Sequence, residues 1–210
     1  MMDFFTRSCK NSLPDRPWRL FFACVLLFSS LLAHAQSTVE ISQLRIERSD
    51  EEVQLSVQLH FELPSVVEEA LLKGIPMVFV MGADTLRERW YWYDKKVTSS
   101  ERSMRLAYQP LTRRWRLNVS SGPGAATAVG LSLNQSYENL AQAMTAIKRV
   151  TKWKIADAAD FDPTVRYRAE FRFRLDLTQL PRPFQIGALG QTDWDIAIST
   201  VTPFSLENVK

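Results

Sequence analysis

The stretch VRYRAEFRFRLDL, residues 165–177, decides the fold class of this chain. Apolar residues, aromatic residues or alanine occupy every odd position, and arginine, glutamate or aspartate occupies every even one. A helix would distribute these arginines around its circumference, whereas a strand places all of them on one side. The stretch therefore predicts a β-strand with one dry face and one charged face.

The same period of two recurs along the chain, and each repeat of it predicts a further strand. Alternating runs occupy residues 53–63, 104–108, 115–119 and 194–198. The alternation at 39–47 changes phase between Ile41 and Leu44, which predicts a β-bulge.

Two other segments are also expected to be strands. The run at 75–80 is apolar on both faces and predicts a central strand beginning at Pro76. Residues 87–93 predict one more strand, which brings the expected number to about eight.

Two helices are expected between the strands. Residues 64–73 begin with proline and are followed by Gly74, as in a short capped helix. A longer helix is predicted from Ser136 as N-cap, with Glu138 in its first turn, toward the basic residues at 148–152. The fold class is therefore mainly β: an antiparallel β-sandwich-like domain of about eight strands with two helical insertions.

Residues 1–35 have the pattern of a cleavable export signal. Four basic residues precede an apolar run at 20–32, and Ala33 and Ala35 form a small-x-small site. An uncleaved membrane anchor is the alternative, but this run is shorter than the roughly 20 residues that a spanning helix needs. We expect cleavage between Ala35 and Gln36, a location outside the cytoplasm, and a single domain over residues 36–210 without a transmembrane span.

Removal of the signal would also remove several reactive groups. Both cysteines, Cys9 and Cys24, lie within it, and His60 is the one histidine that remains. Disulfides, thiolate nucleophiles and sites built on Cys or paired His are thereby excluded, so we expect no metal and no cofactor. The remaining 22 basic and 21 acidic residues give no overall attraction to nucleic acid.

Two clusters of basic residues are the candidates for a binding surface. The first is the aromatic and basic segment at 87–96, where strand alternation would place Trp90 and Trp92 on one face and the two tyrosines on the other. Such a face could stack on sugar rings or anchor a protein partner. A strand that buries one of its aromatic faces is the alternative.

The second candidate is the arginine face of 165–177 together with the arginines at 113–116, which could bind a phosphate or carboxylate. Here the alternative is a solvated, salt-bridged face on which Glu170 and Asp176 pair with their cross-strand neighbours. The candidate residues are Arg87, Arg89, Trp90, Trp92, Arg114, Arg116, Arg172 and Arg174.

No residue is assigned a catalytic role. His60 lies on the polar face of its strand and no nucleophile motif accompanies it. The aspartates at 157, 160 and 162 lack the spacing and the glycine of a calcium loop. Asp193 and Asp195 share one face of a predicted strand, and paired carboxylates can hydrolyse glycosides.

Several ordered segments carry a resemblance to a known family. They are a Gly-Ile-Pro strand start at 74–76, the hairpin sequence RLAYQPLTR at 105–113, an amphipathic helix, the strand at 172–176, and Leu-Pro-x-Pro-Phe at 180–184. The chain resembles the exported proteobacterial proteins catalogued as domain of unknown function 4390, over roughly residues 41–199. One departure is Pro110, because a polar residue is more usual before the leucine.

The resemblance implies a periplasmic setting and supplies no catalytic residue. Members of the family tend to be encoded beside a membrane sensor kinase of the nitrogen-regulation type, which implies an envelope or inner-membrane protein partner. We favour a noncatalytic periplasmic binding or accessory module. An envelope hydrolase using the carboxylates of Asp193 and Asp195, and a structural envelope component, are the alternatives.

Overall fold

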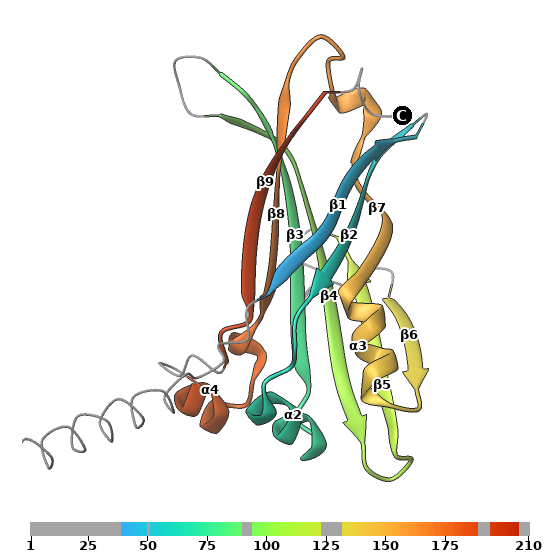
Figure 1. Cartoon of the computed structure of the whole chain (residues 1–210), viewed down its shortest axis with the longest axis vertical. Coiled ribbons are helices and arrows are strands. Elements are labelled where there is room, and N and C mark those ends of the chain that lie inside the picture. The colour runs from blue at the N-terminus through green and yellow to red at the C-terminus, as the bar shows by residue number, and fades with distance from the viewer. Residues whose placement is uncertain (1–38, 50, 90–93, 123–131, 189–193, 206–210) are drawn as a thin grey trace, which may run out of the picture. The chain divides into compact units, whose positions relative to one another are not determined.

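Two antiparallel β-sheets build most of what the computed structural model describes, namely residues 39–49, 51–89, 94–122, 132–188 and 194–205 (Figure 1). The smaller sheet has the order β1-β2-β7, with bounds Glu40–Arg48, Glu52–His60 and Arg149–Asp157. The larger sheet has the order β6-β5-β4-β3-β8-β9, with bounds Ser132–Tyr137, Arg114–Ser121, Lys95–Gln109, Met77–Arg87, Tyr167–Leu175 and Ala197–Phe204. All described residues belong to one compact unit spanning Gln36–Lys210.

Helices are short and lie between strands in the chain order. The α-helices are α2 (Ser65–Leu72), α3 (Leu140–Lys148) and α4 (Arg182–Ala188), and the 3-10 helices are η2 (Ala158–Asp160) and η3 (Leu177–Gln179). The predicted mainly β, antiparallel, sandwich-like class is confirmed. The described residues form nine strands where about eight were expected, and α4 is a helix that was not expected. Within these residues, no helix is both long enough and apolar enough to cross a membrane.

β8 has the two faces that its alternation predicted. Phe171 and Phe173 are fully buried, whereas the side chains of Arg172 and Arg174 are 45% and 54% exposed. The apolar face lies toward the smaller sheet and the arginine face lies on the outer side of the larger sheet. The sequence pattern of this strand therefore places the core on one side of the six-stranded sheet.

An aromatic contact joins the two sheets. Phe61, directly after β2, has its ring centroid 5.3 Å from Phe173 and 6.4 Å from Phe79. The rings of Phe79 on β3 and Phe173 on β8 stack on each other at 5.9 Å. α3 adds its buried residues Ala143, Met144 and Ile147 to the same core.

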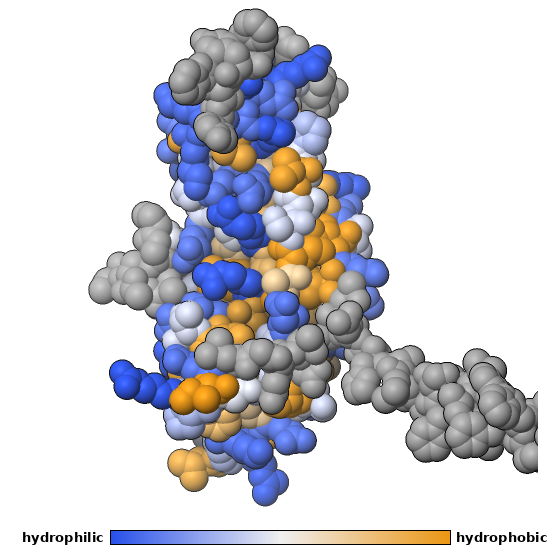
Figure 2. Space-filling model, turned by 90° about the vertical axis from the view of Figure 1, so that its left-hand side faces the viewer, coloured by the Kyte–Doolittle hydropathy of each residue, from blue (hydrophilic) through white to orange (hydrophobic). Residues whose placement is uncertain are grey.

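The predicted central strand is confirmed and is longer than expected. β3 is flanked by β4 and β8, and all five residues from Met77 to Met81 are buried. β1 and β9 are edge strands, and apolar side chains reach the surface on the side of the domain that carries β9 (Figure 2). Val201 on β9 is half exposed, and Leu44 on β1 is partly buried.

Several predicted boundaries are confirmed. The register of β1 against β2 shifts between Ile41 and Gln43, where the bulge was expected. α2 follows Pro64 and is terminated by Gly74, whose φ of +83° suits glycine. The predicted strands at 53–63, 104–108 and 115–119 correspond to β2, β4 and β5.

The second predicted helix is wrong at both ends. Ser136 belongs to β6, and the N-cap is Asn139, whose side chain accepts from the backbone N–H of Gln142 at 2.9 Å. Lys148 is the last helical residue, and the basic residues after it begin β7. Tertiary pairing with β2 thus ends the helix where the local sequence favoured its continuation.

Two predicted strands are also misplaced. Arg87 ends β3 and Glu88 and Arg89 lie outside any strand, while residues 90–93 lie outside the described residues. Trp194 and Ile196 are buried but precede β9, which begins at Ala197. Their burial produces the apolar alternation ahead of β9, although the backbone N–H of Leu175 on β8 already donates to the carbonyl of Ile196 at 2.9 Å.

The aromatic contact between the sheets generates a stability prediction. We expect Phe173→Ala to lower the free energy of unfolding by about 3–5 kcal/mol, because it removes a buried ring and leaves a cavity between the sheets. Urea unfolding monitored by circular dichroism measures this. Val201→Ala is the matched control on the exposed side of β9 and should change stability by under about 1 kcal/mol. Equal losses of unfolding free energy in both variants would contradict the stabilising role given to the Phe173 ring.

Candidate functional site

A buried carboxylate organises the outer face of the larger sheet. The side chain of Asp84 on β3 is only 2% exposed and accepts three hydrogen bonds. The donors are Arg172 Nη2 at 2.6 Å, Lys96 Nζ at 2.7 Å and Ser99 Oγ at 2.5 Å. Asp84 thereby links β3 to β4 on one side and to β8 on the other.

These contacts set the ionisation of Asp84. Burial alone would raise the pKa of this carboxyl group, but the hydrogen bonds from Lys96, Ser99 and Arg172 outweigh burial and hold the pKa below its usual value. The same contact with Asp84 raises the pKa of Arg172. The carboxylate is therefore a charged structural group at neutral pH.

The remaining arginines of β8 are also paired. Arg172 Nη1 lies 3.0 Å from Glu170, and Arg174 Nη1 lies 3.4 Å from Asp176. Arg168 contacts Glu88 and Asp94. These contacts occupy the guanidinium groups of all three arginines, so this face is salt-bridged. The expected cross-strand partners of Glu170 and Asp176 are wrong, because each acid pairs with an arginine two residues away in the chain.

Three other arginines form what we call the arginine cluster: Arg105, Arg114 and Arg116. On this outer face Arg105 is opposite Asn118, Arg116 is opposite Ala107, and Arg114 is opposite Gln109. All three are exposed, and no described residue forms an ion pair with them. Arg116 is a same-face neighbour of both Arg105 and Arg114 at about 7 Å, so its positive charge is repelled by each of them.

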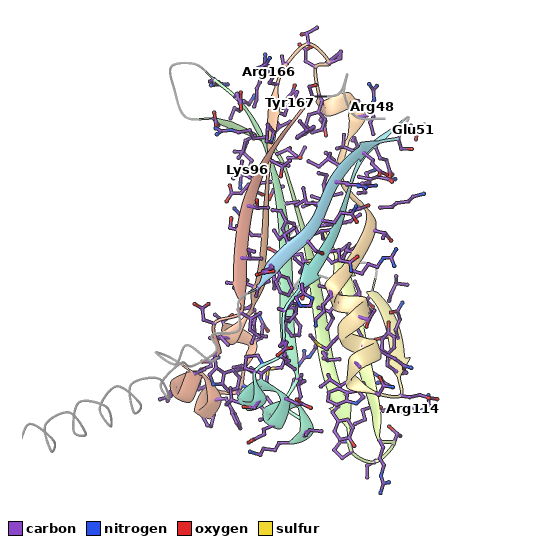
Figure 3. The ribbon with its side chains drawn as sticks, in the orientation of Figure 1. Arg48, Glu51, Lys96, Arg114, Arg166 and Tyr167 are labelled. Atoms are coloured by element: carbon purple, nitrogen blue, oxygen red, sulfur yellow. The ribbon has the colours of Figure 1, made fainter. Side chains whose placement is uncertain are left out.

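The hairpin between β4 and β5 adds an apolar residue beside the arginine cluster. Leu111 at its tip is fully exposed, and Arg113 adopts the left-handed region with φ of +52°. Figure 3 shows Arg114 at this end of β5, with Lys96 and Arg166 toward the opposite end of the larger sheet. A positively charged surface with one protruding leucine thus lies at one end of this sheet.

The structure does not gather all the predicted site residues in one place. Arg87 and Arg89 lie at the far end of β3, where Arg87 is opposite Lys95 and Tyr167. Trp90 and Trp92 lie outside the described residues. Arg172 and Arg174 are engaged in ion pairs, whereas Arg87, Arg89, Arg114 and Arg116 form no ion pair with a described residue. Of these four, Arg114 and Arg116 lie on the same face of one strand, beside Arg105.

The outer face of the smaller sheet holds a feature that the sequence reading missed. A hollow of about 230 Å³ lies over β1, β2 and β7. Its lining residues are Gln43, Arg45, Glu47, Ser56, Val57, Gln58, Arg149, Val150, Thr151 and Lys152. We call it the bulge hollow, because β7 carries an extra residue there and Lys152 has a φ of +50°. The sequence signal is the interruption of apolar alternation between Val150 and Trp153.

The histidine and the aspartates that the sequence analysis weighed as catalytic or calcium-binding residues lie at separate places in the structure. His60 is exposed at the end of β2, and Asp195 is exposed before β9, while Asp193 lies outside the described residues. Asp157 pairs with Lys154 at 2.7 Å. No group of three or more acidic, His or Cys side chains suited to a metal ion occurs in the described part of the chain.

Comparison with known proteins agrees with the resemblance carried by the hairpin and strand segments. The family described as Domain of unknown function (DUF4390) matches residues 36–203. The chain belongs to this family. No curated protein and no solved structure matches this DUF4390 domain.

The Asp84 contacts predict acid-sensitive stability. The depressed pKa of Asp84 means that its contribution is present above the unfolded-state pKa, near 3.8, and is lost as the pH falls through the lower folded value. We expect Asp84→Asn to lower the free energy of unfolding at pH 7 by about 1–3 kcal/mol, because Arg172 and Lys96 lose their common counter-ion while staying half exposed.

Urea unfolding at pH 7 and pH 3 measures this effect. The difference between wild type and Asp84→Asn should shrink at pH 3, whereas Glu62→Gln, an exposed carboxylate, is the control for general charge loss. A difference that stays constant between the two pH values would contradict the role given to Asp84.

Proposed function

We propose that this DUF4390 domain is a noncatalytic binding or accessory module that acts in the periplasm and binds an acidic segment of an envelope or inner-membrane protein. The arginine cluster beside Leu111 is the observation that carries the proposal. The sequence pattern of an export signal at residues 1–35 supports the proposed location.

The electrostatics of the cluster favour an anionic partner. Three exposed guanidinium groups at neighbouring positions repel one another, and a bound carboxylate would relieve this repulsion. Each guanidinium can hold a carboxylate through two parallel hydrogen bonds. The charge alone would suit any anion.

The exposed leucine favours a protein over a small anion. Leu111 places a whole aliphatic side chain in solvent at the hairpin tip between β4 and β5, where a partner could cover it. An acidic peptide with an apolar residue would satisfy both features. The sensor kinase implied by the family resemblance is one candidate partner.

Crosslinking in intact cells tests the proposal. With a photoreactive amino acid at position 111, we expect a crosslink to one envelope protein, and Arg114→Glu combined with Arg116→Glu should reduce its yield at least about tenfold. Arg48→Glu combined with Arg166→Glu is the matched control, because both residues are exposed and Figure 3 shows them at the end of the domain opposite Arg114. A crosslink that survives reversal of the cluster, or that is lost equally in the control, would overturn the proposed surface.

The location has its own test. We expect the protein recovered from the periplasmic fraction to begin at Gln36, as read by N-terminal sequencing. Replacing Ala33 and Ala35 by Asp should block processing, because signal peptidase accepts small residues there. Recovery of the unprocessed chain in the cytoplasm of wild-type cells would contradict the periplasmic assignment.

A further inference from the structure

The bulge hollow has a floor made by the smaller sheet. Ser56 on β2 is opposite Arg45 on β1, and the side-chain oxygen of Ser56 accepts from the backbone N–H of Lys152 at 3.1 Å. This hydrogen bond fixes the bulge of β7 against β2. Polar groups therefore surround the hydroxyl at the centre of the hollow.

The bulge changes which side chains β7 presents to solvent. Val150 and Trp153, three residues apart, are both buried in the core, and the two residues between them are both exposed. A regular strand would place only one outward residue between two inward ones. The extra residue adds the ammonium of Lys152 to the outer face, beside Thr151.

The backbone at this point is strained. Lys152 occupies the left-handed region, which costs a non-glycine residue on the order of 1 kcal/mol and is over-represented at functional sites. Glycine or asparagine would adopt this φ more readily. A lysine here retains a cation at the expense of local stability.

The charge of the hollow is predominantly positive. Arg45, Arg149 and Lys152 line it with a single carboxylate, that of Glu47. No ion pair joins any of these three cations to another residue in the described ranges. On the same sheet, the carboxylates of Glu52 and Asp157 are instead bound by Lys154 at 3.2 and 2.7 Å.

The orientation of Arg45 is also held. In the amide orientation that satisfies both groups, the side-chain oxygen of Gln43 accepts from Nε and Nη2 of Arg45, at 2.9 Å each. The neutral amide restrains the guanidinium without cancelling its charge. Gln58 and Thr151 supply further neutral polar groups to the lining.

We propose that the bulge hollow binds the phosphate group of a small phosphate ester, with Arg45, Arg149 and Lys152 around the anion and Ser56 at its base. A phosphate monoester carries up to two negative charges and suits three cations with one nearby carboxylate. The volume of about 230 Å³ exceeds that of the anion alone, so the neutral polar side chains are left to contact its organic part. A free ester and a lipid headgroup share this chemistry.

Ligand titration tests the proposal. The purified mature chain is titrated with glycerol 3-phosphate, and with sodium chloride at equal ionic strength, while two-dimensional NMR records the amide signals of β2 and β7. We expect saturable shifts at Ser56, Thr151 and Lys152 with the ester only. Shifts that are absent, or that sodium chloride reproduces, would overturn the site.

Lys152→Gly separates binding from folding. Glycine accepts the positive φ, so this variant should be at least as stable as wild type while its Kd for glycerol 3-phosphate rises about tenfold or more. Arg114→Gln, in the arginine cluster, is the control and should bind the ester as wild type does. Equal affinity in Lys152→Gly and wild type would overturn the proposal, whatever the result of the crosslinking at Leu111.

Vesicles distinguish the two sources of the phosphate. Cosedimentation with phosphatidylglycerol vesicles that Lys152→Gly abolishes, and that phosphatidylcholine vesicles do not support, would assign the site to a lipid headgroup. Binding of glycerol 3-phosphate without vesicle binding would assign it to a free ester. Cosedimentation unaffected by Lys152→Gly would contradict a role of the hollow in lipid binding.

Discussion

The packing of Phe61 against Phe79 and Phe173 is the interaction on which the rest of the structure depends. It places an aromatic residue of the smaller sheet against two neighbouring strands of the larger one. Lys148 Nζ lies 4.9 Å from the Phe61 ring, so α3 meets the same point. The apolar side chains on the inner faces of both sheets pack in this core. Charged side chains therefore lie on the outer faces, in contact with solvent.

Charge on the outer face of the larger sheet is divided between two uses. Around Asp84 the arginine and lysine side chains neutralise a buried carboxylate, and they connect three strands. At the hairpin end the arginine cluster has no such counter-ion among the described residues. Arginines on the same face of the larger sheet therefore have different roles, according to whether a nearby residue supplies a carboxylate. We propose binding at the arginines that have no such partner among the described residues.

The smaller sheet also has exposed cations without ion-pair partners among the described residues, but here backbone irregularities place them together. The shifts of register in β1 and β7 flank the hollow, and the left-handed backbone of Lys152 turns an additional cation outward. A regular three-stranded sheet would present a flat polar face. The irregularities produce a concave, positively charged surface, which is the form that a small anion requires.

The local period of two was enough to determine the mainly β class, the strands β2 and β8, the bulge of β1 and the burial of β3. The signal is alternation for β2 and β8, a change in its phase for the bulge of β1, and a run that is apolar on both faces for β3. None of these signals depends on distant residues. β6 gave no such signal because all but the last of its residues are exposed. The basic residues after Lys148 fit the end of a helix equally well, and only their pairing with β2 makes them a strand.

The functional surfaces depended on tertiary structure to a greater degree. The sequence identified Arg114, Arg116, Arg172 and Arg174 as candidates, but it could not distinguish the paired from the unpaired, because Asp84 lies 88 residues before Arg172. The bulge hollow combines residues from three strands, and its strain is a property of one backbone angle. Sequence periodicity therefore determined which side chains point outward, whereas strand register decided which of those charges meet a partner, since pairing between distant strands has no local pattern.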